Sequence, residues 1–183
     1  MMVWDMILGM TGMEMEKDVL AQELCRACGF CCNGYLFIWA KLRPAELAPA
    51  EALGLQVFRS DPAQRGFSQP CPLWKGECSI YTSIHYPKVC RAYKCKLLKN
   101  ILADTTSFET ALEVVEQTKK MVLDLKELLP PSDNQNFRER LVEQLEHPQH
   151  EAWEDATYAY FRLKADALLC IYDEVFGVTD LFE

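Results

Sequence analysis

The chain has 183 residues, of which 50% are hydrophobic and 25% are charged, a composition that excludes disordered and low-complexity proteins. Its formal net charge of -8 disfavours duplex nucleic acid as a partner, because such binding depends mainly on neutralised phosphates. No apolar run approaches the roughly 20 residues needed to cross a bilayer, so we expect no membrane-spanning segment.

Short elements between cysteines are predicted for the first half of the chain. A short helix over residues 14–24 leads into the first cysteines. Residues 44–53 predict a second helix, with a proline in its first turn and a glycine just after its end. Residues 71–81 predict a tight hairpin in which Gly76 makes the turn.

The second half of the chain is predicted to be helical. Apolar residues recur at steps of three and four over residues 108–129, directly after a serine and a threonine that can cap a helix. Further helices are predicted over residues 137–145 and 151–176, and Gly177 is placed to stop the last one. Three helices with short connections predict an antiparallel bundle.

These elements predict a mainly α fold, with an irregular, metal-stapled N-terminal half that includes a small hairpin, followed by a C-terminal antiparallel helical bundle. We expect residues 20–100 to form a cysteine-cluster metal-binding region and residues 101–183 to form a helical region packed on it, within one compact domain. Residues 71–100 carry six basic and one acidic side chain. This cationic segment either lowers the pKa of nearby thiols or is simply a solvated face.

The sequence holds nine cysteines, and eight of them fall between residues 25 and 95. Residues 1–12 contain no Lys or Arg, and Asp5 interrupts their apolar stretch, whereas a secretory signal has a basic start and a longer apolar core. We therefore expect a cytoplasmic protein with reduced thiols. In that compartment, dense cysteines favour metal binding over a disulfide framework.

The first four cysteines lie within eight residues, as Cys25-Arg-Ala-Cys28-Gly29-Phe-Cys31-Cys32. Two residues between cysteines let one loop wrap both sulfurs around a single ion or cluster corner. Gly29 permits a turn in which backbone N–H groups point at sulfur. Adjacent side chains in extended backbone leave on opposite sides, so we expect Cys31 and Cys32 to serve different centres, unless one is not a ligand.

Four more cysteines follow downstream. Cys71 and Cys78 lie on opposite arms of the predicted hairpin, within reach of a shared ion. Cys90 and Cys95 would be rotated by about 140° on a continuous helix, so either the backbone turns between them or they belong to separate sites. Cys170 lies in an apolar stretch and is expected in the core. The predicted metal ligands are Cys25, Cys28, Cys31, Cys32, Cys71, Cys78, Cys90 and Cys95.

The number and spacing of the cysteines leave the identity of the metal open. Four thiolates suit both tetrahedral zinc and an iron–sulfur cluster such as 4Fe-4S. Eight cysteines match two zinc sites by count, whereas the run from Cys25 to Cys31 with a remote fourth ligand matches the spacing of bacterial ferredoxins. The proline expected after the remote ligand follows only Cys71 among the downstream cysteines.

The cysteine motifs over roughly residues 20–100 resemble the YkgJ-type cysteine-cluster family. They are Cys25-x-x-Cys28-x-x-Cys31-Cys32, Cys71-Pro-Leu, Gly76-Glu-Cys78-Ser-Ile-Tyr81 and Pro87-Lys-Val-Cys90-Arg91-Ala-Tyr93-Lys-Cys95. The resemblance implies a zinc- or iron-chelating protein with all eight family cysteines present. The larger flagellin lysine N-methylases look like distant relatives, which implies that the pattern can house an iron–sulfur cluster and favours that cofactor over zinc.

The chain departs from the family pattern before Cys90. Tyr86 stands before Pro87, where the family usually has arginine, and the stretch from Cys78 is about two residues longer than usual. The longer loop contains His85, a substitute ligand in the less favoured interpretation.

Three functions are consistent with these features, and whether the protein is an enzyme stays open. The favoured one is a metal-binding protein whose iron–sulfur cluster serves electron transfer, metal delivery or the support of a partner enzyme. The second is a methylase-like enzyme that modifies a peptide or protein, with aromatic residues that line a pocket instead of packing in the core: Phe30, Tyr35, Phe37, Trp39 and Trp74. The third is a zinc-stapled adaptor whose acidic helices recruit a basic partner. Each of them implies a protein or peptide partner.

Overall fold

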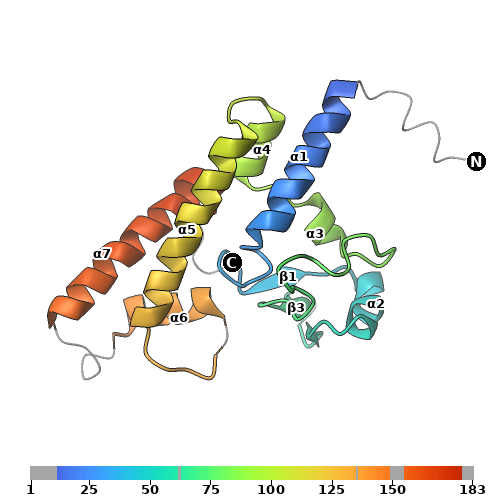
Figure 1. The fold of residues 1–183 in the computed structure, drawn as a ribbon. Helices are drawn as coiled ribbons and strands as arrows, with labels where there is room; N and C mark the ends of the chain where they lie inside the picture. The colour runs from blue at the N-terminus through green and yellow to red at the C-terminus, as the bar shows by residue number, and fades with distance from the viewer. Residues whose placement is uncertain (1–11, 62, 135, 149–154, 179–183) are drawn as a thin grey trace, which may run out of the picture.

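A computed structural model describes residues 12–61, 63–134, 136–148 and 155–178, and it is mainly helical (Figure 1). Three long helices, α1 (Gly12–Cys28), α5 (Phe108–Leu128) and α7 (Asp155–Ile171), dominate it. α5 lies between the other two and packs against both. The helical layer therefore includes α1, which comes from the half of the chain that we predicted to be irregular. Within the described residues, no helix combines the length and the apolar composition that crossing a bilayer requires.

α5 forms where the apolar periodicity predicts it. Ser107 caps its first turn, because the Ser107 hydroxyl accepts a hydrogen bond from the Thr110 N–H at 3.1 Å. One stripe of the helix is completely buried, and this stripe contains Ala111, Val115 and Val122. α5 thereby supplies the centre of the core.

The two later helices also confirm their predicted segments. α6 (Phe137–Glu146) is capped by Asn136, whose side chain accepts from the Glu139 N–H. α7 continues as a π-helical turn over Tyr172–Phe176 and stops at Gly177, which has a left-handed φ of 69°. Residues 151–154, the predicted start of this last helix, lie outside the described residues.

One hydrophobic core connects the front half of the chain with the helices. Buried residues from the front half, including Leu24, Phe30 and Leu97, belong to the same cluster as Val115 and Phe161. A second, smaller cluster lies under the sheet and contains Leu42, Ala50, Leu55 and Phe67. The region that carries most of the cysteines is therefore anchored directly to α5 and α7.

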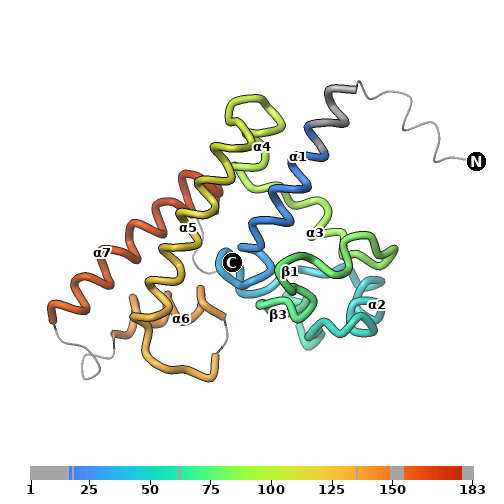
Figure 2. The backbone as a smooth tube through the Cα atoms, viewed as in Figure 1, coloured from blue at the N-terminus to red at the C-terminus, as the bar shows by residue number. Residues whose placement is uncertain are grey.

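A small antiparallel sheet is the main element that the sequence did not predict. Its strands are β1 (Trp39–Lys41), β2 (Val57–Phe58) and β3 (Gly66–Ser68), in the order β1-β3-β2. Strands of two or three residues are too short to show an alternating pattern in a sequence. The backbone trace in Figure 2 shows that the part of the molecule around β1, β3 and α2 consists mostly of loops.

The short helices frame this loop-rich region. The predicted helix over residues 44–53 is present as η1 (Pro44–Glu46) followed by α2 (Leu47–Ala52). Two further helices, α3 (Lys88–Ala92) and α4 (Lys96–Leu102), precede α5. The predicted hairpin over residues 71–81 is instead a tight turn with a single β-bridge, between Trp74 and Cys78.

Candidate metal centre

The first two cysteines lie in the last turn of α1, and a glycine directly follows them. Gly29 ends the helix with a φ of +67°, in the left-handed region that favours glycine. A Cβ atom at this position would lie 2.2 Å from the Trp74 ring. Trp74 belongs to the turn between Cys71 and Cys78, so this close contact packs the end of α1 against the second cysteine-bearing segment.

A backbone hydrogen bond joins the same two segments. The Cys71 N–H donates to the carbonyl of Cys32 at 2.7 Å. The loop after α1 is itself closed by Asn33, whose backbone and side-chain N–H groups both donate to the Gly29 carbonyl, at 2.8 and 3.0 Å. Local turns and the hydrogen bond between Cys71 and Cys32 therefore fix the path of the loop that carries Cys31 and Cys32.

The backbone turns between Cys90 and Cys95. Cys90 lies in α3, which ends before Tyr93, a residue in extended conformation with ψ of 128°. Cys95 is the N-terminal cap residue of α4, also with extended backbone. The two thiols are therefore not on one continuous helix, and the first of the two predicted alternatives, a backbone turn, is present.

Backbone N–H groups hydrogen-bond to the sulfur atoms of four cysteines. These donors are Phe30 for Cys28, Leu73 and Trp74 for Cys71, Ile80 for Cys78, and Leu97 and Leu98 for Cys95. Each of these hydrogen bonds lowers the pKa of its thiol, because an N–H donor stabilises the thiolate. Such donors are the outer shell that thiolate ligands of metals use.

Burial nevertheless dominates the ionisation of the eight thiols. It is the largest cause that raises the pKa of each of them, and neighbouring thiols raise the pKa further for six. The pKa of Cys25 rises to about 11, although the residue as a whole is exposed. The pKa values of Cys28 and Cys90 rise to about 12. In the metal-free protein these thiols are therefore protonated at neutral pH.

The interactions between thiols sort the eight cysteines into two sets of four. The first thiol set is Cys25, Cys28, Cys31 and Cys95, and the second thiol set is Cys32, Cys71, Cys78 and Cys90. After burial, the pKa of Cys28 is raised by Cys95 and Cys25, whereas that of Cys32 is raised by Cys71, Cys90 and Cys78. The sets overlap, since Cys78 raises the pKa of Cys25, Cys25 raises those of Cys32 and Cys90, and Cys32 raises that of Cys31.

The two sets interleave along the chain. Adjacent Cys31 and Cys32 have different main neighbours, as do Cys90 and Cys95. A small cavity of about 50 Å³ lies against all four members of the first thiol set and Cys32, and its other walls are mostly apolar. In the parts of the chain that the structure describes, no group of three or more His, Cys, Asp or Glu side chains already has the arrangement of a metal site. The thiols therefore lie close together, but their sulfur atoms do not have the arrangement of metal ligands in the described residues.

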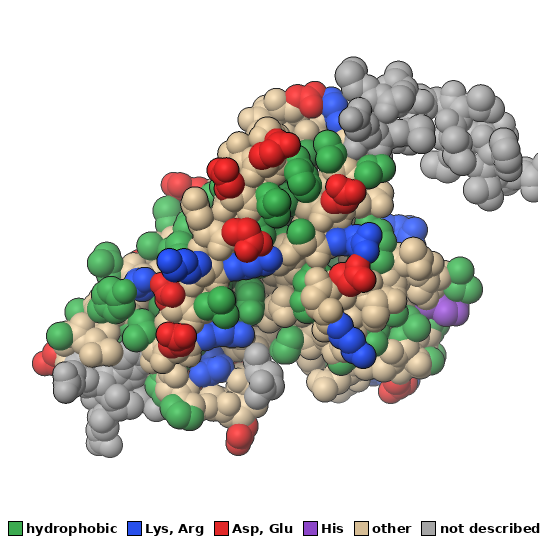
Figure 3. All heavy atoms as spheres, in the orientation of Figure 1, with side chains coloured by type: hydrophobic (Ala, Val, Ile, Leu, Met, Phe, Trp, Pro, Cys, Tyr) green, Lys and Arg blue, Asp and Glu red, His purple; other side chains and the backbone are tan. Residues whose placement is uncertain are grey.

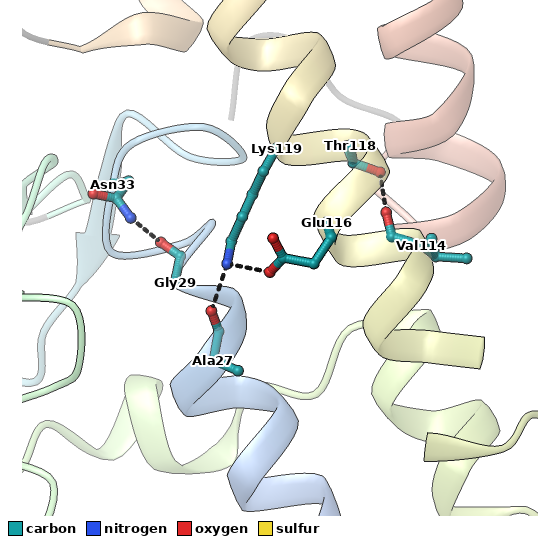
Figure 4. A network of polar contacts seen from close by, with 7 residues as sticks. All are labelled: Ala27, Gly29, Asn33, Val114, Glu116, Thr118 and Lys119. Atoms are coloured by element: carbon teal, nitrogen blue, oxygen red, sulfur yellow. Dashed lines mark hydrogen bonds and ion pairs between the residues drawn. The ribbon is translucent and has the colours of Figure 1, made fainter. Parts of the chain in front are cut away.

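A lysine from α5 holds the end of α1 in place (Figure 4). Lys119 Nζ donates to the carbonyl of Ala27 at 2.9 Å and pairs with Glu116 Oε1 at 2.8 Å. The lysine charge also lowers the pKa of Cys28. Nothing in the sequence signals this role, because Lys119 looks like any other charged residue on an amphipathic helix.

An open cleft of about 270 Å³ lies beside both thiol sets. It touches Cys25 from the first set and Cys90 from the second. Three tyrosines and two basic residues complete most of its lining: Tyr81, Tyr86, Tyr93, Arg91 and Lys94. The Arg91 guanidinium lies 5.5 Å from the centre of the Tyr86 ring, within the range of a cation–π interaction.

Other predicted residues lie away from the thiols or at the surface. The six basic residues of segment 71–100 are all exposed, as the solvated-face interpretation expects. The charge of one of them, Lys99, also lowers the pKa of Cys95, as the other interpretation expects. His85 is exposed, and its backbone N–H donates to Ser83 Oγ. The prediction that Cys170 is in the core is wrong, because Cys170 is exposed. The buried stripe of α7 contains Phe161, Ala165 and Leu168, and Cys170 lies about 200° around the helix from Leu168.

The aromatic residues that were predicted to lie either in the core or along a pocket are divided between the two places. Phe30 is in the core, with Tyr35 and Phe37 packed against it. Trp74 covers Gly29, as described above. Trp39 instead lines a surface hollow next to the sheet.

Comparison with curated proteins and with solved structures found no match. The model of the CxxCxxCC family, described as "Putative zinc- or iron-chelating domain", matches residues 24–120. This range contains all eight thiols of the two sets and extends into α5 as far as Lys120, so it includes Lys119. The chain therefore belongs to the CxxCxxCC family of zinc- or iron-chelating domains.

Proposed function

We propose that the protein carries an iron–sulfur cluster on cysteines of the two thiol sets and serves electron transfer, metal delivery or the support of a partner enzyme. The observation that carries this proposal is the gathering of eight thiols into two adjacent sets of four. Four thiolates are the ligand set of the common iron–sulfur clusters. When bound, such a cluster supplies one-electron redox chemistry.

The surroundings of the first thiol set support iron–sulfur in particular. Leu24, Phe30 and Val115 are among the apolar residues that line its cavity, and N–H groups bond to the sulfurs of Cys28 and Cys95. Hydrogen bonds to sulfur and exclusion of water are the means by which proteins stabilise and tune such clusters. The role of these residues would be to hold the thiolates and to shield them from solvent.

Analysis of protein purified without oxygen tests the proposal. We expect iron and sulfide together with visible absorption, both lost in Cys28→Ser and retained in Cys170→Ser, a matched change at an exposed cysteine outside both sets. The corresponding variant of the second set, Cys71→Ser, shows whether that set binds a centre of its own. A colourless protein with zinc in place of iron would overturn the iron–sulfur assignment in favour of two tetrahedral zinc sites.

A second candidate function, an enzyme with a cluster-assisted site, is favoured by the open cleft that touches Cys25 and Cys90. An enzyme of this kind needs a metal position that is not occupied by cysteine. Added azide would then bind iron and change its electron paramagnetic resonance spectrum. An unchanged spectrum indicates full thiolate ligation and favours electron transfer or delivery.

A further inference from the structure

Two surface hollows lie side by side and share part of their lining. The first, of about 790 Å³, lies between the sheet residues Trp39 and Phe58 and the segment that leads into α6. The second, of about 530 Å³, continues along α6 as far as His147. Ile38, Asn134 and Glu139 line both hollows. We call the combined surface the α6 groove; its two parts together suit an elongated ligand rather than a compact one.

The charge of the α6 groove has one sign. Four exposed carboxylates line it, and among its described lining residues there is no Lys or Arg. These carboxylates are Asp133, Glu139, Glu143 and Glu146. On the face of the molecule seen in Figure 3, acidic and basic side chains lie interspersed. A groove lined by one sign of charge attracts ligands of the opposite sign, here cations.

A buried acceptor also lacks a partner in this groove. Gln69 is 8% exposed, lines the first hollow, and its Oε1 has no hydrogen-bond partner within the described residues. Its backbone is fixed, since the N–H donates to the Ile38 carbonyl at 2.9 Å and the carbonyl accepts from Asn136 Nδ2 at 3.0 Å. Buried polar atoms normally have a hydrogen-bond partner, so a ligand that brings an N–H donor would supply the bond that this oxygen lacks.

Aromatic rings form the wall of the groove on the side of the sheet. The rings of Trp39 and Phe58 meet edge to face, with centroids 5.6 Å apart. Trp39 covers Gly66, where a Cβ atom would lie 2.8 Å from the indole ring. Tryptophan is the best partner for the guanidinium or ammonium group of a basic side chain.

We propose that the α6 groove binds an extended basic segment of a partner polypeptide. Its Arg and Lys side chains pair with Glu143 and Glu146 and lie on Trp39, while one of its N–H groups donates to Gln69 Oε1. Cys71 also lines the groove, so the bound segment lies beside the second thiol set. The proposal goes beyond the metal function and does not depend on it.

Binding of a fluorescently labelled peptide of alternating Arg and Ser residues to the metal-loaded full chain, followed by fluorescence anisotropy, tests the proposal. Glu143→Gln combined with Glu146→Gln should weaken binding about five-fold or more, because two exposed ion pairs are lost. Gln69→Leu should also weaken binding about five-fold, since it removes the acceptor at little change in size. Glu109→Gln combined with Glu113→Gln is the matched control. It removes the same charge from exposed positions on α5 outside the groove and should leave the affinity unchanged.

Several results would overturn the proposal. The absence of peptide binding, or equal weakening in the α5 control, would leave only diffuse charge attraction. Competition by spermidine at the same concentration as the peptide would assign the groove to a small polyamine instead. A dimer that disappears in the Glu143→Gln, Glu146→Gln variant would make a second copy of this chain the occupant. Metal content measured on the same samples separates these outcomes from a failure of the proposed metal function.

Discussion

At the scale of single residues, Gly29 joins two cysteine-bearing segments that are distant in the sequence. It combines a left-handed backbone with a position against the Trp74 ring. Gly54 also has a left-handed φ, of +92°, but a Cβ atom there would meet nothing within 4 Å. A comparison of alanine substitutions at the two glycines therefore distinguishes the cost of backbone strain, which both share, from the cost of a steric clash, which only Gly29 has.

We expect Gly29→Ala to lower the free energy of unfolding by more than Gly54→Ala and to reduce the metal content. Both substitutions carry a left-handed backbone cost of roughly 1–2 kcal/mol, but only the first must also displace Trp74. Urea denaturation of the two purified variants measures the difference. Equal losses would mean that the contact between Gly29 and Trp74 is not required.

The ionisation of single thiols predicts how the metal-free protein responds to pH. Burial holds the folded pKa of Cys25 at about 11 and that of Cys28 at about 12, above the ordinary value of 9.0. In the metal-free protein, the stability from neutral thiols is fully present below pH 9 and is lost as the pH rises through these folded values. Denaturation midpoints of metal-free protein should therefore fall above pH 9. The fall should be smaller in Cys28→Ser, and an equal fall in that variant would contradict the assignment.

At the scale of elements, helix caps differ in how far their contacts reach. Ser107 caps α5 from an exposed position and hydrogen-bonds to Thr110. Asn136 caps α6 while almost fully buried, and its side-chain amide also donates to the carbonyls of Gln69 and Phe37. This second cap connects α6 with the segment that leads out of the small sheet.

Asn136→Ala should therefore destabilise the protein by about 2–4 kcal/mol, because it removes a cap and leaves two carbonyls without their donor. Ser107→Ala, which removes only a cap, should cost about 1 kcal/mol. Thermal or urea unfolding of the two variants gives the comparison. Similar losses would show that the contacts of Asn136 beyond α6 add nothing.

At the scale of the whole molecule, one hydrophobic core contains residues from both predicted regions, on either side of residue 100. Leu24, Phe30, Leu36 and Leu97 belong to the same buried cluster as α5 and α7. The helical half therefore needs apolar side chains from the cysteine-bearing half to complete its core. This arrangement supports a single domain, which we propose for the chain.

Residues 101–183 produced alone should not unfold cooperatively, because they lack that part of the core. Circular dichroism during heating is the measurement, with the full chain as the control. A sharp transition in the fragment would instead indicate that the helical half is an independent domain.

The sequence by itself determined the long helices of the second half and the cysteine-cluster family. The limits of α5 follow from apolar spacing and from Ser107, both local properties of the chain. The family and its eight cysteines follow from motifs of fixed spacing. A local pattern also misled, since the apolar neighbours of Cys170 do not reveal which face of α7 is buried.

Only the tertiary structure decided which thiols are neighbours and where the grooves lie. Cys95 joins Cys25 and Cys28 because α3 and α4 bring it back to the end of α1. Lys119 reaches the Ala27 carbonyl across 92 residues of chain, a contact that no spacing encodes. Such contacts depend on the packing of the entire core, so they exist only once the distant segments have been brought together.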